Sequence, residues 1–300
     1  MVNFPSLQSL IVDFNFGVNN DAVLCFEIFS FGRFPKLKVL RLLDIYIKLI
    51  KPGPPATTVL MNSATLPQLR EFTLRVWSNF YSRDMTNEAK ADITYGLLAR
   101  HPQLESLAVL SFSGQFWRPL SLERDHCPNV RVLCVDAWTE VTDALSPSLA
   151  GQLQKLSGYM GPRSLPLLEH MPMLQECVLH ISHYLSISFI HSLPMSIQRL
   201  VVTTHPGFHP ENSLEYIEYL TRLHNLTHVG GFNWTQSSVP GLKDNLLRLS
   251  ALTSLEYIGI RGPRSLLMWF SLQSLKDDSF GSETEHLTHS QVFPWDFSWG

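Results

Sequence analysis

A short sequence pattern with hydrophobic residues at its first, fourth and sixth positions recurs along this chain, and we call each copy a phrase. Its ten copies begin at Leu7, Leu37, Leu69, Leu104, Val130, Leu153, Leu174, Ile197, Leu226 and Leu255. Of the thirty positions that the phrase assigns to a core, all but Gly158 and Gly231 are apolar. Alternation between apolar and polar residues is typical of a strand with one buried face. We therefore expect ten short strands.

The segments around the phrases complete a repeating unit. Helical spacing of apolar residues predicts helices over 87–101 and 211–223. Six copies carry a proline two residues before position one, which ends the preceding helix because proline lacks the amide donor. These prolines are Pro5, Pro35, Pro67, Pro102, Pro128 and Pro172. Strands that alternate with helices in one direction predict a parallel sheet with outer helices.

The phrase L-x-x-L-x-L resembles the leucine-rich repeat, and its spacing suits the long variety with a helix after each strand. The x-P-x-L-x-x-L form is similar to the irregular repeats of fungal F-box proteins. This resemblance implies an α/β leucine-rich-repeat solenoid of about ten irregular repeats over residues 1–265, with 266–300 as a C-terminal cap or tail. The ninth position, often asparagine in the family, is asparagine only at Asn15. We therefore expect no continuous asparagine ladder there.

Composition narrows the class of protein. The chain has 300 residues, 45% of them hydrophobic, which is enough for a large core. A net charge of −3 without like-charge runs argues against nucleic-acid and membrane partners. Four cysteines without close pairs and an N-terminus without a signal peptide predict an intracellular protein, cytoplasmic or nuclear.

Candidate chemistry is sparse, and we predict no enzyme, cofactor or metal. None of the common nucleotide-binding, zinc-protease or hydrolase motifs occurs. Glu176 and His180 fall about 13 Å apart on a strand, too far to share an ion. Two other polar clusters, His205 with His209 and the stretch 283–289, fit a turn and a polar tail better than a metal site. The closing stretch FPWDFSWG either caps the last repeat or docks elsewhere, and we favour the cap.

Positions three, five and seven of each phrase are expected to line the open, concave face. The residues we assign there to partner binding are Glu71, Arg75, Asp136, Lys155, Tyr159, Glu176, His180, Arg199, His228, Phe232, Tyr257 and Arg261. Both charge signs and several rings suit a protein partner better than a phosphate backbone. The other interpretation is a solvated sheet face with no dedicated ligand.

The resemblance implies the substrate-recognition part of an F-box-type ubiquitin ligase receptor. In that family an adaptor-binding helical module lies directly before the repeats, and we find no counterpart to it in these 300 residues. A Skp-type adaptor is therefore expected as a partner only if an F-box exists upstream. Because the phrase begins close to Met1, we expect either a partner over the first strand or a missing natural start. The alternative is a free-standing repeat scaffold or inhibitor with no link to a ligase.

Overall fold

The computed structural model describes two compact units, residues 1–150 and 151–300. Within them it describes residues 4–13, 34–46, 66–77, 96, 98–111, 122–135, 140–181, 187–204, 214–233, 244, 246–261, 267–276 and 286–296. Each of the ten phrases contributes one strand. They are β1 (Ser9–Asp13), β2 (Val39–Tyr46), β3 (Glu71–Trp77), β4 (Ser106–Ser111), β5 (Val132–Val135), β6 (Lys155–Met160), β7 (Glu176–Ile181), β8 (Arg199–Thr204), β9 (His228–Asn233) and β10 (Tyr257–Arg261).

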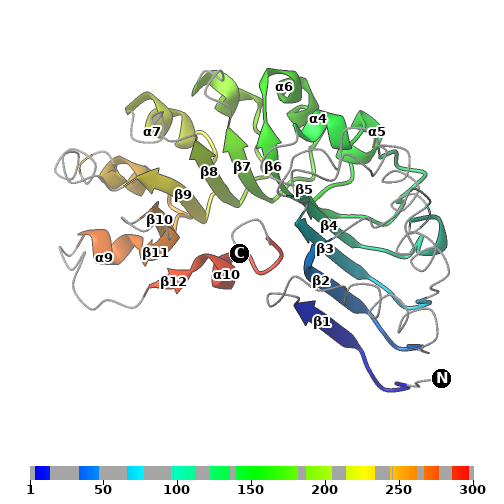
Figure 1. Ribbon diagram of the computed structural model, residues 1–300. Coiled ribbons are helices and arrows are strands. Elements are labelled where there is room, and N and C mark those ends of the chain that lie inside the picture. The colour runs from blue at the N-terminus through cyan, green and yellow to red at the C-terminus, as the bar shows by residue number, and fades with distance from the viewer. Residues whose placement is uncertain are drawn as a thin grey trace. The chain divides into compact units, whose positions relative to one another are not determined.

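The strands follow the order of the chain in both units (Figure 1). The first unit holds the parallel strands β1 to β5, and the second holds the parallel strands β6 to β10. β11 (Leu267–Ser271) then pairs antiparallel with β10, and β12 (Leu287–Thr288) pairs antiparallel with β11. The predicted fold class is confirmed: an α/β fold with a sequentially ordered, mostly parallel open sheet, consistent with a leucine-rich-repeat-like solenoid.

The helical elements of the described residues are shorter than the resemblance implies. They are α4 (Val141–Ala144), α5 (Pro147–Ala150), η1 (Pro162–Ser164), α6 (Leu165–Leu168), η2 (Ile187–Ser192), α7 (Leu214–Leu220), η4 (Leu249–Ala251), α9 (Leu272–Lys276) and α10 (His289–Val292). Of the helix predicted over 87–101, residues 96 and 98–100 are helical and 87–95 lie outside the described residues. Copies only 21 to 26 residues long leave little chain for a full helix after the strand and turn.

The core lies where the phrase predicts it. In the third copy Leu69, Phe72 and Leu74 are each no more than 5% exposed, and the same positions are buried in the copies from β4 to β10. Burying one such leucine or phenylalanine stabilises the fold by about 2 kcal/mol. Neighbouring strands stack equal positions on each other, so these side chains form one continuous apolar layer within each unit.

In the six copies that carry it, the proline before the strand occupies a β-turn. The amide of Leu69 donates to the carbonyl of Leu66 at 3.0 Å, and the equivalent bond recurs in Leu104 and Val130. Proline is then the second residue of the turn, a position that its fixed φ suits. Its role is therefore wider than the helix stop that the sequence predicts.

Side chains link several turns to the turn of the preceding repeat. Gln103 donates to the carbonyls of Leu66 and Pro67, and Asn129 donates to the carbonyl of Pro102 at 2.9 Å. Asn225 donates likewise to the carbonyl of Met195. These donors immediately precede position one. The described turns are thus tied together by side chains that lie just before the strands.

One irregularity changes which way side chains point. Between β9 and β10 the register shifts: Gly230 faces Gly259, but Ile260 faces Phe232, so Gly231 is an extra residue in β9. Gly231 has a φ of 107°, and a Cβ on it would lie 1.8 Å from the carbonyl oxygen of Val202. Only glycine fits this bulge, because any Cβ would collide with the backbone of β8.

We predict that Gly231→Ala strongly destabilises the protein. The added Cβ meets backbone that cannot move aside, and the left-handed φ adds strain, so the free energy of unfolding should fall by about 3 kcal/mol or more. Urea denaturation followed by circular dichroism measures this change. Gly151→Ala is the matched control, since its Cβ would lie at an ordinary 3.5 Å from the nearest atom. Equal stability of the two variants would contradict the role given to the bulge.

Candidate functional site

The register of the second unit places the position-three side chains in one row across five strands. The row runs Lys155, Glu176, Arg199, His228 and Tyr257, each paired with the next in the sheet. Neighbouring strands lie about 4.8 Å apart, so each side chain reaches the next one. Five residues from five repeats, all predicted to share a face, are brought together.

Glu176 is the electrostatic centre of this row. Its Oε1 lies 3.1 Å from Nζ of Lys155 and 3.8 Å from a guanidinium nitrogen of Arg199. Its Oε2 accepts a hydrogen bond from the indole Nε1 of Trp295 at 2.5 Å. The carboxylate side chain is only 13% exposed. A buried carboxylate is tolerated because cations and a donor surround it.

The other end of the row is aromatic. The rings of His228 and Tyr257 stack with centroids 4.9 Å apart, and His228 also contacts Trp269 of β11. Burial, with a smaller contribution from the nearby Arg199, lowers the pKa of His228 to about 4. His228 is therefore neutral near pH 7.

Position seven forms a second, shorter row in the same unit. Tyr159, His180 and Thr203 face one another across β6, β7 and β8. The ring Nδ1 of His180 lies 2.7 Å from the hydroxyl of Thr203. Burial lowers the pKa of His180 to about 4, although the Asp296 carboxylate opposes that shift. Arg261 is half-buried at the end of β10.

The first unit holds fewer of the predicted residues. Glu71 on β3 forms an ion pair with Arg41 of β2, with N–O distances of 2.6 and 2.7 Å, and Arg75 lies half-buried farther along β3. Asp136 lies outside the described residues. From β3 to β10 position five is buried and mostly occupied by small residues such as Ala108, whereas in β1 and β2 it is the exposed Ile11 and the half-buried Arg41. Positions three and seven therefore carry the chemistry of the face.

The prediction that Phe232 lies on the concave face is wrong. Its ring is fully buried and meets Tyr216 of α7 edge-on, with centroids 6.0 Å apart. The bulge at Gly231 adds one residue to β9, which turns Phe232 to the side of Ile260. Phe232 therefore fills the core position that the sequence assigned to Gly231.

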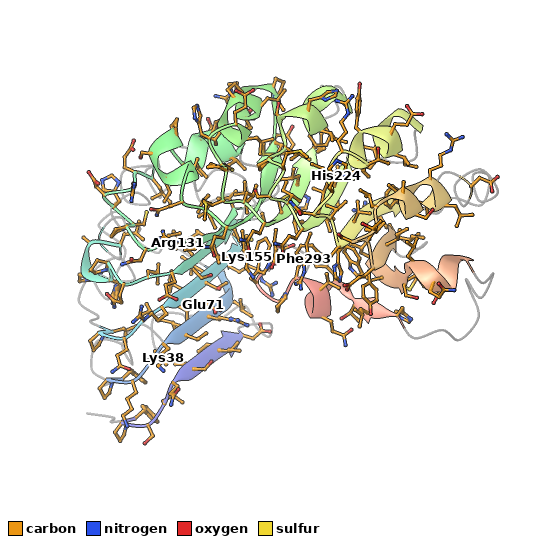
Figure 2. All side chains as sticks on the ribbon, turned by 180° about the vertical axis from the view of Figure 1, so that it is seen from behind. Lys38, Glu71, Arg131, Lys155, His224 and Phe293 are labelled. Atoms are coloured by element: carbon orange, nitrogen blue, oxygen red, sulfur yellow. The ribbon has the colours of Figure 1, made fainter. Side chains whose placement is uncertain are left out.

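The C-terminal segment, residues 286–296, covers the row, and sequence reasoning did not place it there. Trp295 bonds to Glu176, and the carbonyl of Val292 accepts a hydrogen bond from Arg199 at 3.0 Å. Phe293 is fully buried, and its ring lies 5.7 Å from that of Trp269. Figure 2 labels Phe293 on the inner side of the second unit and His224 toward the outer side. The aromatic stretch FPWD is the sequence feature that could have indicated this contact.

The described residues bear on metal binding and on cysteine chemistry. They contain no cluster of three or more histidine, cysteine or acidic side chains suited to a metal ion. His183, His205 and His209, along with Glu283 and Glu285, lie outside them. Burial raises the pKa of the Cys127 thiol to about 12 and also raises that of Cys177, so neither thiol is activated. Across these same residues, no helix is long and apolar enough to cross a membrane.

We predict that stability falls as the pH drops from about 6.5 toward 4. His180 and His228 have pKa values near 4 in the folded protein and an ordinary value of 6.5 when unfolded. Between these values the unfolded chain binds the protons, so acid favours unfolding by about 2 kcal/mol per histidine at pH 5. Urea unfolding at pH 7 and pH 5 measures the loss. His180→Gln and His228→Gln should each reduce it, and His224→Gln serves as the surface control.

No protein-family model matches this chain, and no curated protein matches it. The two rows of side chains, and the segment that contacts the position-three row, are therefore the basis for the functional argument.

Proposed function

We propose that this protein is a protein-interaction module that binds a protein substrate on the inner face of its sheet. The observation that carries the proposal is the row at position three, in which equal positions of successive repeats present both charge signs and two rings on rigid strands. Interfaces between proteins combine charged, polar and aromatic groups in this way. Nucleic acid would require a predominance of basic residues.

The first unit contributes the part of this surface that we propose to test first. Glu71 and Arg75 are four residues apart on β3, so their side chains point to the same side of the strand. Both side chains are half-buried. Arg41 holds Glu71 in place, which lowers the entropy lost when a partner binds. A fixed pair of opposite charges gives a partner both orientation and specificity.

The finer proposal is a substrate receptor of an F-box-type ubiquitin ligase. Its support is the resemblance of the repeat phrase to the irregular repeats of fungal F-box proteins. Under this proposal the inner face binds the substrate, and a Skp-type adaptor binds an F-box encoded upstream of the repeats. The alternative is a free-standing repeat scaffold, which would bind a partner on the same face without an adaptor or cullin.

The experiment is proximity labelling with the full product of the gene. We expect Glu71→Gln with Arg75→Gln to reduce labelling of the substrate about tenfold, because two central polar contacts are lost together. The matched control is Arg70→Gln with Glu105→Gln. These two residues form an ion pair at 2.5 Å outside the row, with both side chains 54% exposed, and the substitutions leave net charge unchanged in the same way.

The labelled proteins separate the two versions of the proposal. A Skp-type adaptor and a cullin that persist in both variants support the ligase receptor, because they bind away from the repeats. Substrate labelling without any adaptor or cullin replaces it with the free-standing scaffold. Labelling that is unchanged in the Glu71 and Arg75 variant, with circular dichroism showing a folded protein, contradicts binding on this face.

A further inference from the structure

The C-terminal segment, residues 286–296, crosses the inner face of the second unit against the order of its strands. After β11 and β12 have paired at the β10 edge, the chain returns to reach Arg199 on β8 and Glu176 on β7. These contacts join residues 93 and 119 positions apart in the sequence. In Figure 1, α10 lies on the inner side of the second unit, whereas α6 and α7 lie on its outer side. A cap at the β10 edge does not require this return.

The contacts of the segment with the row are those of a bound peptide. Arg199 donates to a backbone carbonyl, that of Val292, which any peptide offers. Glu176 accepts the indole N–H of Trp295, whose side chain is mostly buried. Charged side chains that hold a peptide carbonyl and an indole N–H give affinity and sequence preference together.

An aromatic side chain two residues before the tryptophan supplies the apolar contact. Phe293 is fully buried between Trp269 of β11 and His289 of α10, with ring centroids 5.7 and 5.1 Å away. Its ring also meets Trp295 edge-on at 5.9 Å. Buried aromatic anchors of this kind carry most of the affinity in many interfaces.

The segment also fixes its own shape. Thr288 and Gln291 form a capping box at the start of α10, and His289 bonds to the carboxylate of Asp296 at 3.0 Å in a buried site. These bonds join residues within the segment, whose first part, Leu287–Thr288, is the strand β12 paired with β11. A short peptide that carries the same residues therefore retains the means to adopt this shape.

We propose that the row formed by Lys155, Glu176, Arg199, His228 and Tyr257 is a peptide-binding site whose resident ligand is the chain's own C-terminal segment. The partner is a protein segment with two aromatic residues two positions apart, the second a tryptophan. It binds by displacing residues 286–296, so the segment controls access to the site. That a substrate protein uses this site rests on the proposed function. The binding of a peptide to the site does not depend on it.

The test uses the full chain and a fluorescently labelled peptide of residues 286–296. Phe293→Ala with Trp295→Ala weakens the resident segment, so the peptide should bind this variant at least tenfold more tightly than wild type, measured by fluorescence anisotropy. Adding Glu176→Gln should weaken peptide binding about tenfold. Adding Glu105→Gln, at an exposed site outside the row, should leave it unchanged. A peptide with Trp295→Phe lacks the indole donor and should bind more weakly to the variant.

The proposal would be overturned if wild type and variant bound the peptide equally, or if Glu176→Gln had no effect on binding. Elution of the variant as a dimer would also overturn it, because the face would then bind a second copy of this chain. If circular dichroism shows that the double variant is not folded, the single variant Trp295→Phe replaces it, since this change removes only one hydrogen bond. The peptide should again bind the variant more tightly than wild type. The assay contains only purified chain and peptide. Its failure is therefore distinguishable from a failure of the proximity-labelling experiment.

Discussion

The in-register pairing of parallel strands is the constraint on which the rest of this protein depends. Each strand hydrogen-bonds to its neighbour so that equal positions of successive repeats face one another, as Glu176 faces Arg199. The turn before each strand fixes where the register begins, because its position-one amide bonds back across the turn, as at Leu69. One requirement of the backbone thus produces both the apolar layer beneath the sheet and the rows of polar side chains above it.

The β9 strand shows what happens when that register is broken by one residue. Gly231 adopts a backbone conformation open only to glycine and lies against the carbonyl of Val202. The extra residue reverses the alternation, so Phe232 enters the core beside Tyr216. The neighbouring Gly230 and Gly259 leave room for the indole of Trp269, which lies within about 3 Å of where their Cβ atoms would be. Glycines at consecutive repeats therefore shape the site as well as the core.

Much of this arrangement follows from the sequence, because a period-two pattern reports which side of a strand is buried. The ten strands, and the sharing of one face by Lys155, Glu176 and Arg199, were predictable on that basis. Phe232 was not, since a bulge leaves no mark in an alternation pattern beyond an extra glycine. Neither was the position of Trp295, because its contact spans 119 residues and no repeat phrase includes it. The two short helices between β6 and β7, η1 and α6, also escaped prediction, since the family resemblance fixes spacing only on average.

The burial of Glu176 explains why the proposed peptide-binding site should prefer a ligand with tryptophan. A carboxylate that is 13% exposed loses most of its hydration, and three groups compensate: the cations of Lys155 and Arg199 and the indole of Trp295. The cations belong to the sheet and remain when the segment leaves, but the indole belongs to the segment. A ligand that covers Glu176 without an N–H donor in that place leaves Oε2 unsatisfied, at a cost of about 1–3 kcal/mol. Discrimination in favour of tryptophan therefore follows from the chemistry of one buried carboxylate oxygen.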